Sequence, residues 1–379
     1  MVRTAVRPTT RRAKGGRQAP ARRLPARPSA PSNGFSSRSI VVRDALEAME
    51  VCYKRGWTDG LPVVPPTEQA IRAMLRGGKV GPDGLVGEFR SQPITAEKVA
   101  INAVMAGCLP RHLPIVVAAV GGVLDPRFGL HGAAASTQSA CTMVIVNGPA
   151  AQAAGMNARD NALGPGNRAN ATIGRAVRLV IQNACGMRPG LLDRGAIGTP
   201  GRYTCCLAED EANSSWTPLH QERGLPKGSS AVTVFAGWGV HQFSDHLSRT
   251  AEGILNVTAD SMRALGTGNC VGQGESVLLL GPEHRETIAQ DGWDKKAIRG
   301  YLFNHVRRSL ADLKRGSQRA GQVEPGDEEK MIPFVRTPDS IFVVAAGGLG
   351  GRFSSWVPGF TSYNACRAVT VPIDLGPKS

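Results

Sequence analysis

Long apolar runs and aromatic residues are both scarce in this sequence of 379 residues. The longest apolar candidate, residues 113–124, has a proline in its first turn and is shorter than the roughly 20 residues that a helix needs to cross a bilayer. Aromatic residues make up 5% of the chain, too few for the stacking platforms that hold single-stranded nucleic acid. The composition therefore predicts a globular protein with neither a membrane nor a nucleic-acid partner.

Acidic residues are absent before Asp44, whereas ten basic residues fall within the first 40 positions. This segment has almost no large apolar side chain, so we expect residues 1–40 to be a disordered basic tail. Its prolines disfavour a transit peptide, and the lack of an apolar segment after Arg11 and Arg12 disfavours a twin-arginine signal; a dispensable extension is favoured. Without the tail, the formal charge of +15 falls to about +5, which offers few phosphate contacts.

Cysteine patterns typical of zinc sites and secreted disulfide frameworks are also missing. The eight cysteines are irregularly spaced, without a CxxC pair or a signal peptide, which predicts free thiols in a cytoplasmic protein. Cys205 and Cys206 lie in a strand-like segment, so their side chains should point to opposite faces, one in the core and one partly exposed; a vicinal disulfide is disfavoured. Cys141 opens an apolar strand and is either a nucleophile or, more commonly, a small core residue.

Apolar spacing predicts an α/β fold, with a mainly parallel sheet, flanking helices and a helical N-terminal region. Helical spacing dominates residues 41–135, with N-caps at Thr67 and Thr95. Strands that are apolar on both faces and alternate with helices indicate a parallel sheet. Residues 136–379 would form an α/β ligand-binding region, 41–379 are also compatible with one domain, and no internal repeat is detected. The expected strands are 142–146, 231–235, 277–280 and 341–345.

The segment NALGPGNRANATIGRAVRLV (161–180) combines loop residues with positive charge at a helix start. Asn170 or Thr172 can cap this helix and leave its first N–H groups free for an anion. Arg168 and Arg175 oppose the helix macrodipole unless an anion lies there. Two interpretations are equally favoured: Arg168, Asn170 and Arg175 bind a carboxylate or phosphate, or the arginines form salt bridges elsewhere. GPGNRAN is neither GxGxxG nor a Walker loop, so it does not indicate a nucleotide.

Two later loops have the composition of a ligand pocket. LLLGPEHR places Glu283 and His284 after a strand, where open α/β sheets bind ligands. The pair can transfer protons, although a dipole-stabilising Glu beside an exposed His is nearly as common. VVAAGGLGGRFSS ends another strand in four glycines within five residues, and this loop would close over the ligand. Its binding candidates are Gly348 and Ser354, with Arg352 and Ser355 as further polar groups.

Two more segments contain candidate chemical groups. HQFSDH contains His241, Asp245 and His246, a set that divalent metals favour; helix capping by Asp245 is the more common explanation, and no regular element places all three on one face. WTDGLPVVPPT is a stiff, proline-rich strap with apolar anchors at residues 61, 63 and 64. In it, Asp59 is either a general base or, more commonly, the acceptor of an Asx turn.

Five segments together resemble one poorly characterised bacterial family. They are GWTDGLPVVPPTEQAIRAML, NAVMAGCLPRHLPIVVAAV, GPGNRANATIGRAVRL, LGPEHRETIAQDGWDKKAIRGYL and VVAAGGLGG. The resemblance covers nearly all of the chain after residue 41, and Trp-Thr-Asp-Gly-Leu-Pro and Gly-Pro-Glu-His are its most specific parts. Members are associated with a separate module, the UGSC-type (seleno)protein, named for a Sec/Cys-Gly-Ser-Cys motif. This chain has no such run, so the resemblance implies that this thiol or selenol chemistry comes from another chain.

These features predict a cytoplasmic small-molecule enzyme of the lyase or hydrolase class. Arg168 and Arg175 would bind a small anionic, carboxylated substrate, and Glu283, His284 and Asp59 would be the catalytic groups. The alternatives are a redox-linked subunit working with a separate UGSC-type protein and a non-catalytic ligand-binding subunit. The sequence does not identify a cofactor, and it is compatible with a homo-oligomer.

Overall fold

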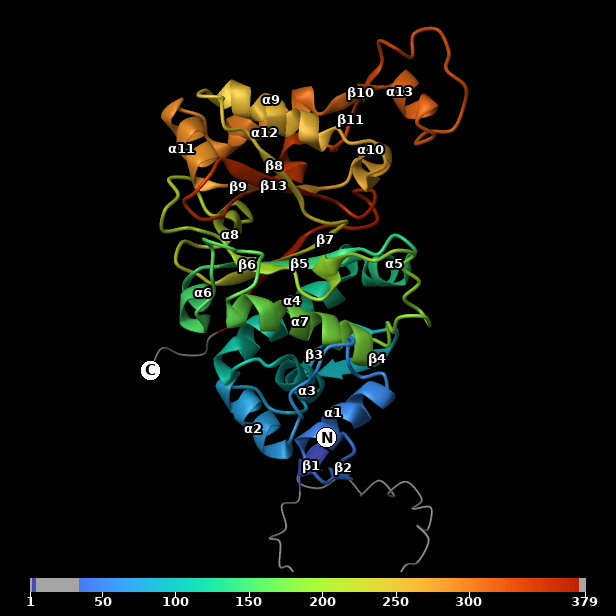
Figure 1. Cartoon of the computed structure of the whole chain (residues 1–379), viewed down its shortest axis with the longest axis vertical. Helices are drawn as coiled ribbons and strands as arrows, with labels where there is room; N and C mark the ends of the chain where they lie inside the picture. Colours follow the sequence, from blue (N-terminus) through green and yellow to red (C-terminus); the bar gives the residue numbers. More distant parts are fainter. Residues whose placement is uncertain (1, 5–33, 375–379) are drawn as a thin grey trace, which may run out of the picture.

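Two four-stranded sheets packed face to face form the centre of the molecule, and helices cover both outer faces (Figure 1). The computed structural model describes residues 2–4 and 34–374. The strand order is β14-β7-β5-β6 in the first sheet and β12-β9-β13-β8 in the second. The strands are β5 (Cys141–Asn147), β6 (Cys206–Ala208), β7 (Ala231–Gly237), β8 (His241–Ser244), β9 (Ser276–Leu280), β12 (Ile341–Ala345), β13 (Phe353–Pro358) and β14 (Val369–Pro372).

The helices fall into two groups, one on each outer face (Figure 1). The first sheet is covered by α4 (Leu113–Leu124) and α7 (Arg168–Asn183), with α3 (Ala96–Ala106) packed behind α7, and the second by α9 (Ala251–Met262), α11 (Pro282–Gln290) and α12 (Lys295–His305). The other elements are β1 (Val2–Thr4), β2 (Ile40–Val42), α1 (Ala45–Lys54), α2 (Glu68–Gly77), β3 (Leu85–Phe89), β4 (Gln92–Thr95), α5 (Leu130–Ala135), α6 (Pro149–Ala154), α8 (Leu219–Glu222), α10 (Gly268–Gly272), β10 (Arg307–Ser309), α13 (Leu310–Arg315) and β11 (Met331–Pro333).

The structure confirms an α/β fold with mixed sheets, so the expectation of a mainly parallel sheet is wrong. In the two central sheets, β5 pairs parallel with β6 and β9 with β12, while β7, β14, β13 and β8 all pair antiparallel. The strands are apolar on both faces because each sheet lies between a helical layer and the other sheet. Burial on both faces thus has a cause other than parallel pairing.

The two halves of the chain repeat one strand order, although no repeat is visible in the sequence. In each half, a strand (β5 or β9) leads through Gly-Pro into helices and returns as a parallel neighbour (β6 or β12). The next strand (β7 or β13) pairs antiparallel with the first, and the last strand (β8 or β14) crosses to the other sheet. The ends of β7 and β13, from which the chain crosses, meet at Gly237 and Gly359, where Trp238 N–H donates to Pro358 O at 3.0 Å and Phe360 N–H donates to Ala236 O at 2.9 Å.

Local sequence signals fix several boundaries as expected. Thr67 caps α2 through Ala70 N–H (3.2 Å), and Thr95 caps α3 through Lys98 N–H (3.5 Å). In the strap after Asp59, Val63 is buried, whereas Leu61 and Val64 are exposed. One apolar anchor therefore holds the strap, rather than three.

The N-terminal region shares a core with the first sheet. One apolar cluster extends from Phe35 through α2, α3, α4 and α7 to Ile373. Phe35 is buried, and the backbone N–H groups of Ser36 and Ser37 donate to the Glu97 carboxylate, each at 2.9 Å. The folded part therefore begins before the expected boundary at residue 40, because these contacts hold residues 35–37 against α3. Residues 2–4 of the expected tail form β1, which pairs parallel with β2, so the expectation of disorder is wrong there as well; residues 5–33 lie outside the described residues.

All eight cysteines are buried and free. Cys205 lies in the core between the sheets, and Cys206 lies in the core under the helices, which confirms that they point to opposite faces. The expectation that one of them is partly exposed is wrong, because apolar layers cover both faces of β6. None of the helices within the described residues combines the length and apolar character needed to cross a membrane.

Candidate functional site

A cleft of about 520 Å³ lies between α7 and the loop that leads to β6. Pockets of this size are typical of small-molecule sites. Glycines at 190, 195 and 198 are among the residues that line the loop side. The polar and charged residues that line the cleft are Asp59, Arg178, Gln182, Asp193, Thr199, Arg202 and Tyr203.

Arg178, Arg202 and Asp193 form the charged wall of this cleft. Arg178 Nη2 lies 2.7 Å from Asp193 Oδ2, and Arg202 Nη2 donates to the same oxygen. The Asp193 side chain is only 3% exposed, and both arginine side chains are largely buried. Burial raises the pKa of Asp193, but the hydrogen bonds and charges of the two arginines lower it further, so the carboxyl is ionised. Two guanidinium groups thus share one negative charge.

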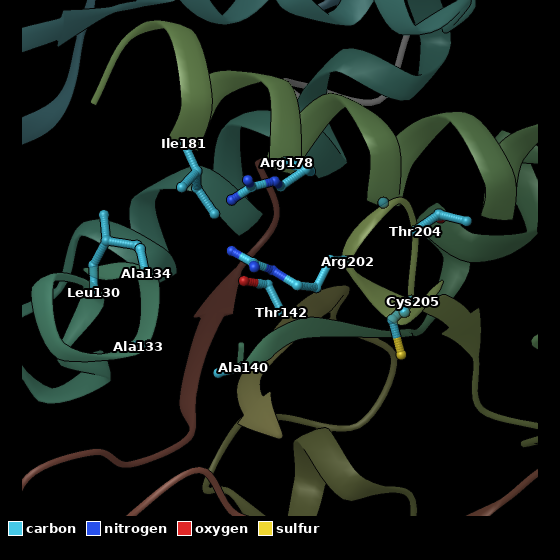
Figure 2. Close-up of a pocket in the computed structure, with 12 residues that line it drawn as sticks. Leu130, Ala133, Ala134, Ala140, Thr142, Arg178, Ile181, Arg202, Thr204 and Cys205 are labelled. Atoms are coloured by element: carbon cyan, nitrogen blue, oxygen red, sulfur yellow. The ribbon is translucent and has the colours of Figure 1, made fainter. Parts of the chain in front are cut away.

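The two arginines reach the same space from opposite sides (Figure 2). Arg178 comes from α7, Arg202 comes from the loop before β6, and Thr142 of β5 lies next to them in Figure 2. A cavity of about 20 Å³, room for one water-sized molecule, lies among these three residues. Burial and the charge of Arg202 lower the pKa of Arg178. An anion bound against the two guanidinium groups in the larger cleft, which both arginines also line, would relieve the repulsion between the two cations.

The expected anion-binding arginines of α7 have other partners. Helix α7 begins at Arg168 and is capped by Asn167, whose Oδ1 accepts from Asn170 N–H at 2.9 Å. The expected cap at Asn170 or Thr172 is therefore wrong, by three or five residues. The Nε and Nη2 groups of Arg168 donate to Gly107 O at 3.0 and 2.9 Å, so Arg168 caps the C-terminus of α3.

Arg175 forms a bidentate ion pair with Asp59. Arg175 Nε and Nη2 each lie 2.8 Å from an Asp59 carboxylate oxygen, and Nη2 also donates to Pro62 O at 2.9 Å. Leu61 N–H donates to Asp59 Oδ1 at 3.2 Å, which makes Asp59 the acceptor of an Asx turn. Burial raises the pKa of Asp59, but Arg175 lowers it further. The geometry matches the salt-bridge interpretation of Arg175, and Asp59 still lines the cleft.

Asn170 does not line a pocket itself but holds a loop that forms one wall of a second pocket. Its buried side chain accepts from Asn157 N–H (3.0 Å) and donates to Asn157 O (2.8 Å) and Ala162 O (2.9 Å). These bonds fix the loop whose residues 159–164 form one wall of a pocket of about 610 Å³; the opposite wall is the glycine loop 347–351. Gly348 and Ser354 line this glycine pocket. The expected ligand-binding residues are thus divided between two places.

His284 is buried behind the glycine pocket. Its Nδ1 lies 2.8 Å from Ser354 Oγ and its Nε2 3.1 Å from Asp245 O; with the proton on Nε2, Ser354 donates to Nδ1. Burial lowers the pKa of His284, so the ring is neutral near pH 7. The ring links β13, α11 and the loop after β8. Glu283 lies in the first turn of α11 and is half-buried.

The three metal-ligand candidates have separate roles. Asp245 accepts from the N–H groups of Leu247 (3.1 Å) and Ser248 (3.0 Å) in the turn before α9, whereas Thr250 caps that helix through Gly253 N–H (3.2 Å); the expected helix capping by Asp245 is therefore wrong. The His241 ring stacks on Trp356, and the His246 ring meets the edge of Phe353. Over residues 2–4 and 34–374, no group of three or more His, Cys, Asp and Glu side chains is arranged to hold a metal ion.

Sequence reasoning missed Arg178, Asp193 and Arg202. Arg178 lies three positions after Arg175 on α7, but Asp193 and Arg202 lie in a loop without periodic spacing. The available signal was a glycine-rich loop, GMRPGLLDRGAIGTPGR, carrying charged residues directly before a strand. Comparisons with known proteins find no family model that matches the chain and no curated protein that matches it. The resemblance to the UGSC-associated family stays a prediction.

Proposed function

We propose that the chain is a small-molecule enzyme that binds a small carboxylated anion between Arg178 and Arg202. One observation carries this proposal: two largely buried guanidinium groups share the single carboxylate of Asp193 beside an open cleft. Arg178 and Arg202 carry two positive charges and Asp193 one negative charge, so a ligand anion would balance the remaining positive charge. Guanidinium groups bind carboxylates through paired, charge-assisted hydrogen bonds.

The reaction that we propose is of the lyase or hydrolase class. Asp59 lines the same cleft as the two arginines, so a carboxylate base would lie near the bound substrate. Its ion pair with Arg175 keeps it ionised and makes it a weak base. A substrate that displaces part of this pairing would make the carboxylate more basic.

Calorimetric titration of the purified protein with acetate, malonate and citrate tests the anion site. Arg178→Ala and Arg202→Ala should each weaken binding by about 1.5 to 3 kcal/mol, the scale of a charge-assisted hydrogen bond. Each variant leaves Asp193 with one arginine, so the fold should be retained. Arg194→Ala is the matched control, because Arg194 lies in the same loop, is exposed and donates only to Leu191 O among its described contacts.

The outcomes separate the proposals. Folded Arg178 and Arg202 variants with unchanged affinity would refute the anion site. Arg202→Lys should recover only part of the affinity if the contact is bidentate. Carboxylate binding without turnover of any tested substrate would favour the non-catalytic ligand-binding subunit over an enzyme.

A further inference from the structure

Cys141 and Cys205 bring two thiols together at the edge of the core between the sheets. Cys141 starts β5, and Cys205 precedes the parallel strand β6, where its carbonyl accepts from Val144 N–H at 2.8 Å. Both side chains belong to the same apolar cluster. A Cβ placed on Gly201 would lie 3.4 Å from Cys141 Cβ, 3.5 Å from Cys141 Sγ and 3.9 Å from Cys205 Cβ. The two cysteines therefore flank one small space.

The surroundings favour a thiolate at Cys141. A hydrogen bond from the Cys205 thiol lowers the pKa of Cys141 by more than burial raises it. Backbone N–H groups at Cys141 and Gly237 and the charge of Arg202 act in the same direction. The same thiol–thiol contact raises the pKa of Cys205. The contact thus makes Cys141 the more acidic thiol of the pair and leaves the proton preferentially on Cys205.

Three other cysteines show what burial does without such a partner. Burial raises the pKa of Cys108, Cys185 and Cys366 to about 12. Thiols with so high a pKa are poor nucleophiles near pH 7, because the thiolate is the reactive form. Cys141 therefore differs from them through its contacts, since all four are buried.

Access to the pair is narrow. Cys141 is 1% exposed and Cys205 4% exposed, and the short 3-10 helix η3 (Pro200–Arg202) covers them, with the side-chain-free Gly201 directly over Cys141. In Figure 2 the Cys205 sulfur extends away from Arg178, toward the other face of the sheet. So little exposure excludes a bulky disulfide as the oxidant, and even a small hydroperoxide needs η3 to move aside before it reaches the sulfur atoms.

We propose that Cys141 and Cys205 are a reversible dithiol–disulfide pair oxidised by small hydroperoxides. The Cys141 thiolate attacks one oxygen of hydrogen peroxide, the O–O bond breaks, and Cys141 becomes a sulfenic acid as hydroxide leaves. The Cys205 sulfur then attacks the Cys141 sulfur and forms the S–S bond. The sulfenic hydroxyl leaves as hydroxide; the Cys205 proton neutralises one of the two hydroxides, and the proton that Cys141 released when it ionised neutralises the other. Two thiols are oxidised, one peroxide is reduced and two waters form.

The test is oxidation of the full-length folded protein by hydrogen peroxide, followed by alkylation of free thiols and peptide mapping. The expected result is a mass lower by two hydrogens, a Cys141–Cys205 disulfide peptide and recovery of both thiols with dithiothreitol. Cys205→Ser should stop at a sulfenic acid on Cys141 that dimedone labels. Cys141→Ser should remove both products.

Cys185→Ser is the matched control, since Cys185 is buried in the other core and its loss should leave the disulfide unchanged. The wild-type map decides the question even where a variant fails to fold. Free thiols at both positions, under peroxide that oxidises other cysteines or methionines, would overturn the proposal. So would equal oxidation of all eight cysteines.

Discussion

Replacing Arg175 by alanine is expected to lower the free energy of unfolding by about 3 kcal/mol, because it leaves a buried carboxylate without its cation. The side chains of Arg175 and Asp59 are 15% and 5% exposed, and two contacts of 2.8 Å join them. Without Arg175, the Asp59 carboxylate keeps only Leu61 N–H at 3.2 Å and the Thr58 hydroxyl at 3.3 Å. These two donors are weaker partners than a guanidinium.

The cost should depend on both partners and on pH. Asp59→Ala combined with Arg175→Ala should cost less than the two single changes added together, because no unpaired charge remains. Since Arg175 holds the pKa of Asp59 below its ordinary value, the pair stabilises the fold above the ordinary carboxyl pKa. This stabilisation is lost as the pH falls through the lowered pKa. The Arg175→Ala variant should lack that loss on the acid side.

Urea unfolding of the wild type and the variants measures these differences. Arg43→Ala is the control, because its ion pair with Glu47 (3.1 Å) is exposed and should contribute about 0.5 kcal/mol or less. An Arg175→Ala protein as stable as the Arg43→Ala control would refute the reasoning. It would mean that Asp59 is satisfied without its cation.

Three further outcomes follow from single residues. Burial lowers the pKa of His112 to about 4. The free energy of unfolding should therefore fall by up to about 3 kcal/mol between pH 6.5 and 4. A His112→Gln protein should lose most of this pH dependence. Gly281→Ala should be strongly destabilising in thermal unfolding, since its Cβ would lie 2.1 Å from Phe353 O, whereas Gly300→Ala in α12 meets nothing and should be stabilising by about 0.5 to 1 kcal/mol. Deletion through Ser37 should melt lower than deletion through Gly34, because it also removes the buried Phe35 and the donors to Glu97; equal melting temperatures would contradict this.

Elements whose signals are local could be predicted from the sequence. Caps such as Thr67 depend on a hydroxyl and an N–H three residues apart, and the strand Ile341–Ala345 is a short apolar run between turn residues. Strand direction could not be predicted. It depends on which distant strand lies alongside, and burial between two sheets produces the same apolar pattern as burial between helices.

From the sequence we expected arginines at an anion site, but the sequence did not indicate which arginines line the cleft. The anion-binding arginines expected on α7 were Arg168 and Arg175, yet Arg175 faces Asp59 and it is Arg178 that lines the cleft. The two differ by three positions, less than one turn. Arg175 has Asp59 as its own partner, whereas Arg178 shares Asp193 with Arg202. This difference depends on where Asp193 and Arg202 lie in the fold, which sequence spacing does not show.

The crossing of β8 and β14 between the sheets affects how the protein can be made. On the ribosome, the first sheet lacks its β14 edge until residues 369–372 have been synthesised, because β14 is the outer neighbour of β7. Until then, β7 exposes a row of unpaired backbone groups that can join other chains. Pairings between segments so distant in sequence also raise the contact order and slow folding. Nascent chains that stop in the last few dozen residues should therefore aggregate far more readily than the finished protein.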